Sequence, residues 1–584
     1  MRAVVLDILI RLANLLIVLL GIATIIFSLP YLAPGGPERA LIGWPYTAER
    51  AAALRVHYGF DRPLYEQYGL WWRNWLDGEW GRSKFTGRPV LREVSLTLPL
   101  TLKLLAEAVM LAVLIGTFLA LVAIYPWHRP YGGRGQGMAV VAAGFPDFYF
   151  GILMKFFFVW HLEWFPIGGF AFFSERPWLA YRQLLLPALS VGILYGIIIG
   201  PRVAARLSAA REIFEDGFDG FLDAGHLREV RLWHVGGKAL GHSLVVLFQH
   251  GALLLGSIML AEKIFTIPGF GDFGIEAFVR RDYPKIQAFL LIMVGGYAVI
   301  RALANGIEAV RERRLKRDPA QFLSDAPAKS PAGLGALCMQ DSFFLGVVLV
   351  AVIATTALFA SYIAPYLPDE VHMKDRLQPP TTQYWMGSDL LGRDMLSRII
   401  FGARYSLMVA GAGATGALVL GFLLGGVPRF AHGLGMALMS PIVGILEAFP
   451  ALIVGLLMMT LLGQGYVQEI AALTAALTPS TAAVFLRGYV AARSRSLIPV
   501  GLIAAVWLQA FGLAIIVEAT LNFLDIGLLP LMPSWGGDLK ANLPYLHVNP
   551  AIVLFPGMAV VISAMGFNLM AEAVRKHLVW RQLG

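Results

Sequence analysis

The sequence predicts an all-α integral membrane protein of about twelve transmembrane helices, arranged as two six-helix halves. Of its 584 residues, 57% are hydrophobic and only 15% are charged, against about 25% in soluble domains. Twelve apolar runs are long enough to cross a bilayer core of about 30 Å, which takes about twenty helical residues. A basic segment rich in Pro, Ala, Gly and Ser divides these runs into two sets of six.

The first apolar run, residues 12–32, is too long for the core of a secretory signal peptide and precedes no small-residue cleavage site. We therefore expect it to be retained as a span. The other expected spans of the first half lie near residues 99–125, 138–162, 184–208, 240–261 and 286–308. Those of the second half lie near residues 342–366, 405–427, 434–462, 467–487, 497–518 and 551–574.

The dividing segment, residues 311–341, separates a first unit at 1–310 from a second unit at 342–584. Its first residues, RERRLKR, predict a cytoplasmic position, because Lys and Arg are enriched in cytoplasmic loops. An even number of spans on each side then places both chain ends in the cytoplasm. The long segments on the other face are rich in Trp and Tyr, which indicates either an interfacial aromatic belt or a platform for a solute-delivering protein.

The two halves share a pattern at the end of their fifth spans. The first reads SIMLAEKIFTIPGFG and the second AIIVEATLNFLDIGL, which places Glu262 and Glu518 in corresponding positions. A duplicated six-span unit predicts a pseudo-two-fold architecture with a transport pathway where the halves meet. Glu262 and Glu518 are therefore candidate pathway residues.

Residues 211–243 form a long polar island between two apolar runs. Its Phe and Leu residues recur at helical spacing, acidic residues fill the other positions, and Gly225 is a plausible helix stop. Such an amphipathic helix fits either a groove on a soluble partner or the surface of the lipid headgroups, and the segment alone leaves both open.

Motifs in both halves resemble the two permease subunits of dipeptide, oligopeptide and nickel-type ABC importers, joined end to end. In the first half they are APGGP (33–37), YGFDRPLYEQY (58–68), GEWGRS (78–83), RPV (88–90), LPLTLKL (98–104), EKIFTIPGFG (262–271) and RRDYPKIQ (280–287). In the second they are MGSDLLGRDMLSRIIFGARYSL (386–407), EATLNFLDIGL (518–528), PSWGG (533–537) and FPGMAVVISAMGFNLMAEAVR (555–575). The resemblance implies the type I importer permease fold, a solute channel between the halves, ABC ATPase partners that bind ATP and Mg, and an extracytoplasmic solute-binding protein.

In the family, a coupling helix with an EAA-x3-G pattern docks into each ATPase subunit. The matching first-half residues are Asp216, Phe218, Asp219, Gly220, Phe221 and Gly225, which keep the acidic residue and the glycine but not the alanines. In the second half, Tyr489, Ala491, Ala492 and Arg493 resemble the start of a coupling helix and RSLIP (495–499) resembles the segment after it. The stretch that should lie between them, including the motif's glycine, is missing from the short segment 488–497. Ten residues give about 15 Å of helix at most, so we expect the first half to carry most of the docking.

Other functions find little support. The sequence has no G-x4-GK-[ST] phosphate-binding loop and no nucleophile–base constellation, so we expect a permease component and not an enzyme, without a cofactor of its own. The single cysteine, Cys338, excludes a disulfide framework, and no Cys/His cluster predicts a metal site. The net charge of +9 comes largely from basic residues at the ends of spans, which is a topology signal and does not indicate nucleic acid.

Ionisable side chains inside the bilayer are costly, and they are functional candidates for that reason. Glu447 precedes Phe449–Pro450, where proline opens the helix, and it is the first pathway candidate; Glu107 is the second. Lys155 and His250 fit either a snorkelling role or a cap on neighbouring backbone.

The leading interpretation is a bacterial inner-membrane permease that imports peptides or a related small solute. A twelve-span secondary transporter driven by an ion gradient would also explain two six-span halves and buried carboxylates. A degenerate permease acting as a scaffold would explain the shortened second coupling segment. Relatives handle peptides, nickel chelates, opines and antimicrobial peptides, and the sequence does not select among these solutes.

Overall fold

The fold was obtained as a computed structural model of the chain. It describes residues 2–33, 36–37, 49, 55, 60–124, 142, 144–166, 169–171, 175–218, 239–315, 341–426, 434–492, 500–528 and 532–583. Within these ranges the structure is helical, apart from turns and two isolated β-bridges.

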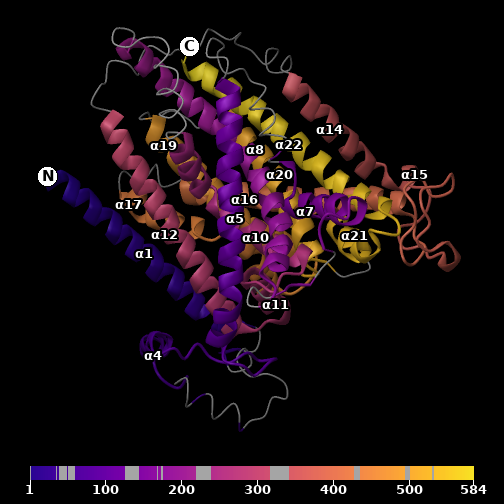
Figure 1. The fold of residues 1–584 in the computed structure, drawn as a ribbon, viewed down its shortest axis with the longest axis horizontal. Coiled ribbons are helices and arrows are strands. Elements are labelled where there is room, and N and C mark those ends of the chain that lie inside the picture. The colour runs from indigo at the N-terminus through magenta and orange to yellow at the C-terminus, as the bar shows by residue number, and fades with distance from the viewer. Residues whose placement is uncertain are drawn as a thin grey trace.

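The helices of the first half form a splayed bundle whose members are drawn from indigo to rose in Figure 1. They are α1 (Arg2–Leu32), α4 (Leu64–Leu76), α5 (Val90–Ile124), α7 (Asp147–Lys155), the π-helical turn η1 (Phe156–His161), α8 (Pro177–Phe218), an unlabelled helix Ala239–Gln249, α10 (Gly251–Phe265), α11 (Phe270–Arg280) and α12 (Tyr283–Leu315).

The second half continues the bundle from salmon to yellow, and its last helix, α22, ends at the side away from α4 (Figure 1). Its elements are α14 (Asp341–Leu358), α15 (Ala360–Ile363), η3 (Met373–Asp375), α16 (Met395–Gly425), α17 (Leu434–Glu447), α18 (Ala451–Leu462), α19 (Tyr466–Ala492), α20 (Val500–Phe523), α21 (Trp535–Asn542), η5 (Leu543–Tyr545) and α22 (Ala551–Leu583).

Among the described residues, nine helices are long and apolar enough to cross a membrane, and two bent helix pairs raise this to eleven. One pair is Ala239–Gln249 with Gly251–Phe265, bent by 77°, and the other is Met439–Glu447 with Ala451–Leu462, bent by 87°. The remaining expected span, residues 138–162, contains α7 and η1. The all-α membrane fold predicted from the sequence is therefore confirmed.

Two spans begin earlier than the hydropathy pattern indicates. Helix α5 starts at Val90, nine residues before the expected start at 99, and carries Glu93 in its first turn and Pro99 inside it. Helix α16 starts at Met395, ten residues before 405, because Asp394 caps it by accepting the Ser397 amide at 2.8 Å. Polar first turns at both helices resemble loops in a hydropathy plot, although they are helical.

A small hairpin precedes the second span of each half. In the first, the Val90 amide donates to the Gly81 carbonyl at 3.0 Å, and in the second the Met395 amide donates to the Gly387 carbonyl at 3.0 Å. Both glycines have positive φ, 81° in each case, a conformation that side chains with a Cβ rarely adopt. The matching hydrogen bonds support an internal duplication.

Helix pairs occur in equivalent positions of the two halves. Helix α5 packs on α8 in the first half, and α16 packs on α19 in the second; likewise α1 packs on α12, and α14 on α22. Small residues allow the close approach: Gly192 and Gly196 of α8 face α5, and Gly421 and Gly425 of α16 face α19. Small residues four apart are typical of helix contacts inside membranes, where dispersion replaces the hydrophobic effect.

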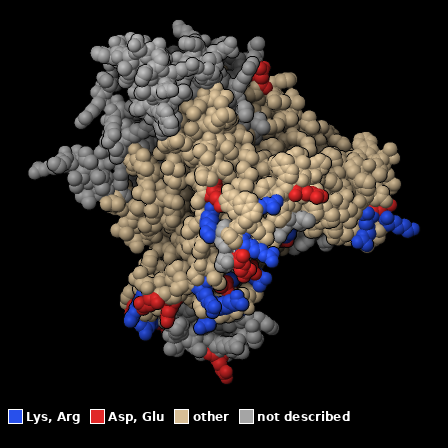
Figure 2. Space-filling view, in the orientation of Figure 1, with Lys and Arg blue, Asp and Glu red and all other residues tan. Residues whose placement is uncertain are grey.

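Charged side chains gather toward the α4 end of the face in Figure 2, and most of the described surface above them is uncharged. A surface without charged side chains suits contact with a bilayer. An ion pair of the second half is enclosed: the Arg398 guanidinium of α16 lies 2.5 Å from the Asp538 carboxylate of α21, and both side chains are 2% exposed.

Candidate functional site

The third span of each half is interrupted at a Phe-Pro pair. Pro146 precedes α7, and Pro450 precedes α18, in each case as the N-terminal cap residue with extended ψ. Proline has no amide hydrogen and clashes with the preceding helical turn, which explains why a helix starts anew at both positions. The repeated break was visible in the sequence at 145–146 and 449–450.

Both third spans contact the opposite half. The Tyr149 hydroxyl of α7 donates to the Leu554 carbonyl of α22 at 2.8 Å, and Phe148 stacks on Phe523 of α20 with ring centroids 5.0 Å apart. In the reverse direction, the Thr460 hydroxyl of α18 donates to the Phe278 carbonyl of α11 at 3.3 Å. Both third spans therefore run where the halves meet, which is the expected position of a transport pathway.

Glu447, the first pathway candidate, ends α17 directly before the 87° bend. Its carboxylate lies 2.6 Å from the guanidinium of Arg301, which belongs to α12 of the first half. The side chains of Glu447 and Arg301 are 17% and 24% exposed, so the pair is largely, but not fully, shielded from solvent. The charge of Glu447 is thus balanced by a cation from the other half.

Asp147 occupies the position after the first-half break. Its carboxylate accepts a short hydrogen bond from the Ser257 hydroxyl of α10, and the hydroxyls of Ser257 and Tyr195 lie 2.9 Å apart. The sequence analysis did not select Asp147. The signal that would have found it is an acidic residue directly after the Phe-Pro pair, in an otherwise apolar run.

Glu262, another pathway candidate, is fully buried and bound to its own half. One carboxylate oxygen accepts the Thr101 hydroxyl of α5 at 2.5 Å, and the other accepts the Asp272 amide at 3.0 Å. Asp272 lies in the first turn of α11, where a carboxylate interacts favourably with unpaired amides and the helix dipole. Through these two hydrogen bonds, Glu262 links the turn between α10 and α11 to α5.

Glu518 lies in the equivalent place of the second half and is also fully buried. The Asn522 side-chain amide donates to Glu518 at 2.9 Å and to Glu469 of α19 at 2.8 Å. The Asn522 oxygen in turn accepts the Leu528 amide at 2.8 Å, which holds the turn after α20. Both carboxylates predicted to correspond thus hold the turn that follows the fifth span, and the sequence analysis missed Glu469.

Glu107 lies on α5, which packs chiefly on α8. One of its carboxylate oxygens has no hydrogen-bond partner among the described residues. Among the described residues, no hydrogen bond or ion pair joins Glu107 to Glu447 or Asp147. Of the two roles predicted for Lys155, the structure shows the backbone cap: its ammonium donates to the Ile264 carbonyl of α10 at 2.8 Å.

The hydrogen bonds of the Thr101 hydroxyl predict that its removal destabilises the protein. Replacing Thr101 with Val keeps the shape but leaves the Phe270 amide, 2.6 Å away, and one Glu262 oxygen without their partner. An unsatisfied buried polar group costs about 1–3 kcal/mol, so the thermal unfolding midpoint in detergent should fall clearly. Thr356→Val is the control, since its hydroxyl only bonds to its own helix at Val352. Equal midpoints for the two variants would contradict the role of Thr101.

No protein-family model matches the chain. A probable peptide ABC transporter permease of Sinorhizobium fredii is 30% identical over 301 residues, which are 50% of this chain and 94% of the relative. Two dipeptide transport system permeases of Alkalihalophilus pseudofirmus, DppB and DppC, match 52% and 40% of this chain at 26% and 28% identity. They are covered over 98% and 84% of their lengths.

The chain belongs to the family of peptide ABC transporter permeases. Each relative is nearly complete within about half of this ABC permease, which confirms that two permease subunits are joined in one chain. Family and fold together make it a multi-pass inner-membrane protein.

The coupling residues of the ABC permease are only partly described. Asp216 and Phe218 lie in the last turn of α8, which continues without interruption from the fourth span. Tyr489, Ala491 and Ala492 end α19, the fourth span of the second half. Asp219, Gly220, Phe221, Gly225 and Arg493 lie outside the described residues, so the coupling contacts stay a prediction.

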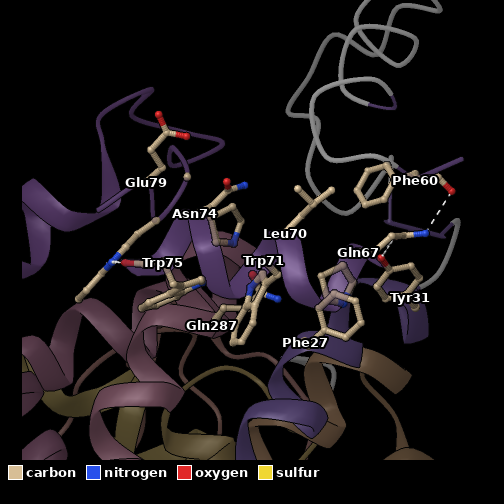
Figure 3. Close-up of a pocket in the computed structure, with 14 residues that line it drawn as sticks. Phe27, Tyr31, Phe60, Gln67, Leu70, Trp71, Asn74, Trp75, Glu79 and Gln287 are labelled. Carbon is tan, nitrogen blue, oxygen red and sulfur yellow. Dashed lines mark hydrogen bonds between the residues drawn. The ribbon is translucent and has the colours of Figure 1, made fainter. Parts of the chain in front are cut away.

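A shallow, open pocket lies at the α4 end of the ABC permease, between α4, the end of α1 and the start of α12 (Figure 3). Six of its fourteen lining residues are aromatic, and Trp75 and Trp80 stack on each other with centroids 4.4 Å apart. Gln67 ties the parts together by donating to Phe60 and accepting from Tyr31. Since these rings mostly contact one another, the cluster anchors α4 to the bundle.

Proposed function

We propose that this ABC permease forms the channel of an ATP-driven importer for peptides or a related small solute. The observation that carries the proposal is the meeting of two interrupted third spans at the interface of the halves, with Asp147 on one break and Glu447, paired to Arg301, on the other. Broken helices that present polar groups between two repeats are typical of transport pathways.

Peptides fit these side chains chemically. A peptide carries an ammonium terminus, and the carboxylates of Asp147 and Glu447 lie at the two breaks, where such a terminus could pair with them. The relatives' printed names, which specify peptide, dipeptide and glutathione transport, support the same solute class.

ATP hydrolysis belongs to separate partner subunits in this proposal, because the sequence has no phosphate-binding loop. The ATPases dock on the ends of α8 and α19, chiefly through the first-half segment 211–243. A solute-binding protein delivers its cargo at the opposite, α4 end. Both chain ends and the linker 311–341 then lie in the cytoplasm, and alternating access follows from movement of the halves around the interface.

Uptake in vesicles tests the proposal. With partner ATPases and a solute-binding protein reconstituted, accumulation of labelled dipeptide should require ATP and survive dissipation of the proton and sodium gradients. Phe221→Asp should abolish this uptake, because it places a charge on the apolar face of the first coupling segment, whereas Ala492→Asp should have a smaller effect. Uptake that follows an ion gradient without ATP would instead establish a secondary transporter, and equal losses in the two variants would defeat the unequal docking.

A further inference from the structure

The break in the second half's third span is held by a residue of the first half. Arg301 binds Glu447 twice, once through the carboxylate at 2.6 Å and once through the main-chain carbonyl, which accepts from Nη1 at 3.2 Å. In an uninterrupted helix that carbonyl would accept an amide four residues later. The bend removes this partner, and the guanidinium takes its place.

Helix α12 contacts a second break one turn earlier. The ring of Tyr297 lies 3.1 Å from the position that a Cβ on Gly251 would occupy. Gly251 is the first residue after the 77° bend in the fifth span. Tyr297 and Arg301 are four residues apart, on one face of the helix, so α12 contacts the bend of its own half and that of the other half.

Neighbouring contacts keep α17 close to the first half. A Cβ on Gly21 of α1 would meet the side chain of Ile445 at 2.6 Å, two residues before Glu447. Since α1 packs along α12, both first-half helices contact the second half's break from the same side. The ion pair is therefore the polar part of a larger, otherwise apolar contact between the halves.

The strength of the pair suits transmission of movement. Charge-assisted hydrogen bonds between a guanidinium and a carboxylate are about twice as strong as neutral ones. Separating the two would break a charge-assisted pair in a shielded position, which is costly. When α12 moves, the corner between α17 and α18 is therefore expected to move with it.

We propose that Arg301 is a positioning residue of the transport cycle, through which the first half moves the broken third span of the second half. The inference rests on the proposed importer function and deepens it. Through this ion pair, movement of the first half would reach the second half, whose own coupling segment is short by the sequence prediction.

Solute transported per ATP hydrolysed, measured in vesicles with the full complex, tests this role. The ratio should fall about tenfold in Arg301→Met, less in Arg301→Lys, and should recover in the exchanged pair Arg301→Glu/Glu447→Arg. Arg182→Met is the matched control, since Arg182 donates to the Trp164 carbonyl at 2.6 Å within the first half.

The ratio separates positioning from folding. A residue needed only for stability would lower the amount of complex and leave the ratio of the surviving complex unchanged, and that result would overturn the inference while leaving the importer intact. Absence of ATP-dependent uptake by the unmodified complex would overturn the proposed function and this inference together.

Discussion

Replacing Arg398 with Met is expected to be among the most destabilising single changes in the protein. Its guanidinium donates to Asp538 through Nε at 2.7 Å and to the Pro368 carbonyl through Nη1 at 2.9 Å, so it joins α16, α21 and the segment after α15. Without it, the Asp538 carboxylate is left buried and unpaired. Removing one partner of a buried ion pair costs about 3–5 kcal/mol.

The loss should depend on pH. Burial raises the pKa of Asp538, whose helix lies outside the candidate spans, and Arg398 opposes this rise. In the Met variant the pKa of Asp538 rises further, so the folded state holds a proton that the unfolded state releases. Stability then falls as pH increases above the ordinary aspartate range, and the deficit should be larger at about pH 8 than at about pH 5.

Unfolding midpoints in detergent at both pH values provide the measurement. Arg73→Met is the control, because the Arg73–Asp77 pair has side chains 77% and 63% exposed. The double variant Arg398→Met/Asp538→Leu should recover much of the lost stability, since an apolar pair removes the unpaired charge. A deficit no larger than that of the control would refute the importance of the pair.

Gly557→Ala is the second change with a large expected effect. A Cβ at this position of α22 would overlap the ring of Tyr149, which is 2% exposed and fixed by its hydrogen bond to Leu554. The ring cannot withdraw without losing that bond. Overpacking typically costs about 1–3 kcal/mol, and here the cost falls on the contact between the halves.

The midpoint of thermal unfolding should therefore fall for Gly557→Ala but not for Gly444→Ala, because a Cβ on Gly444 meets nothing within 4 Å. In a double-mutant cycle, Tyr149→Ala should remove most of the penalty of Gly557→Ala, since the two residues share one contact. Additive losses would show that the helices are not packed as described.

The positions of most spans could be predicted from the sequence. Each span needs about twenty apolar residues, and a helix pairs its backbone N–H and C=O groups within itself. The first residues of α5 and α16 could not be predicted, because polar first turns have the composition of loops. Glu447 could be selected as a candidate from the sequence because it lies close to Pro450 in an apolar run.

The partners of the site residues could not be found in the same way. Arg301 and Glu447 are 146 positions apart, and Asp147 and Ser257 are 110 apart, so their pairing depends on how separate helices pack. Glu262 and Glu518 were correctly matched to each other by their surroundings in sequence. Their hydrogen bonds to the following turns, by contrast, depend on where α5 and α19 lie.

The contacts between the halves are not interchangeable. Tyr149 follows its Phe-Pro pair by three residues, and the same place in the second half holds Ile453, which has no hydroxyl to donate. Two copies of either half would thus lack contacts that the mixed pair makes. Because both halves are carried on one polypeptide, they are synthesised in equal numbers, and each can pair with the other half within the same molecule.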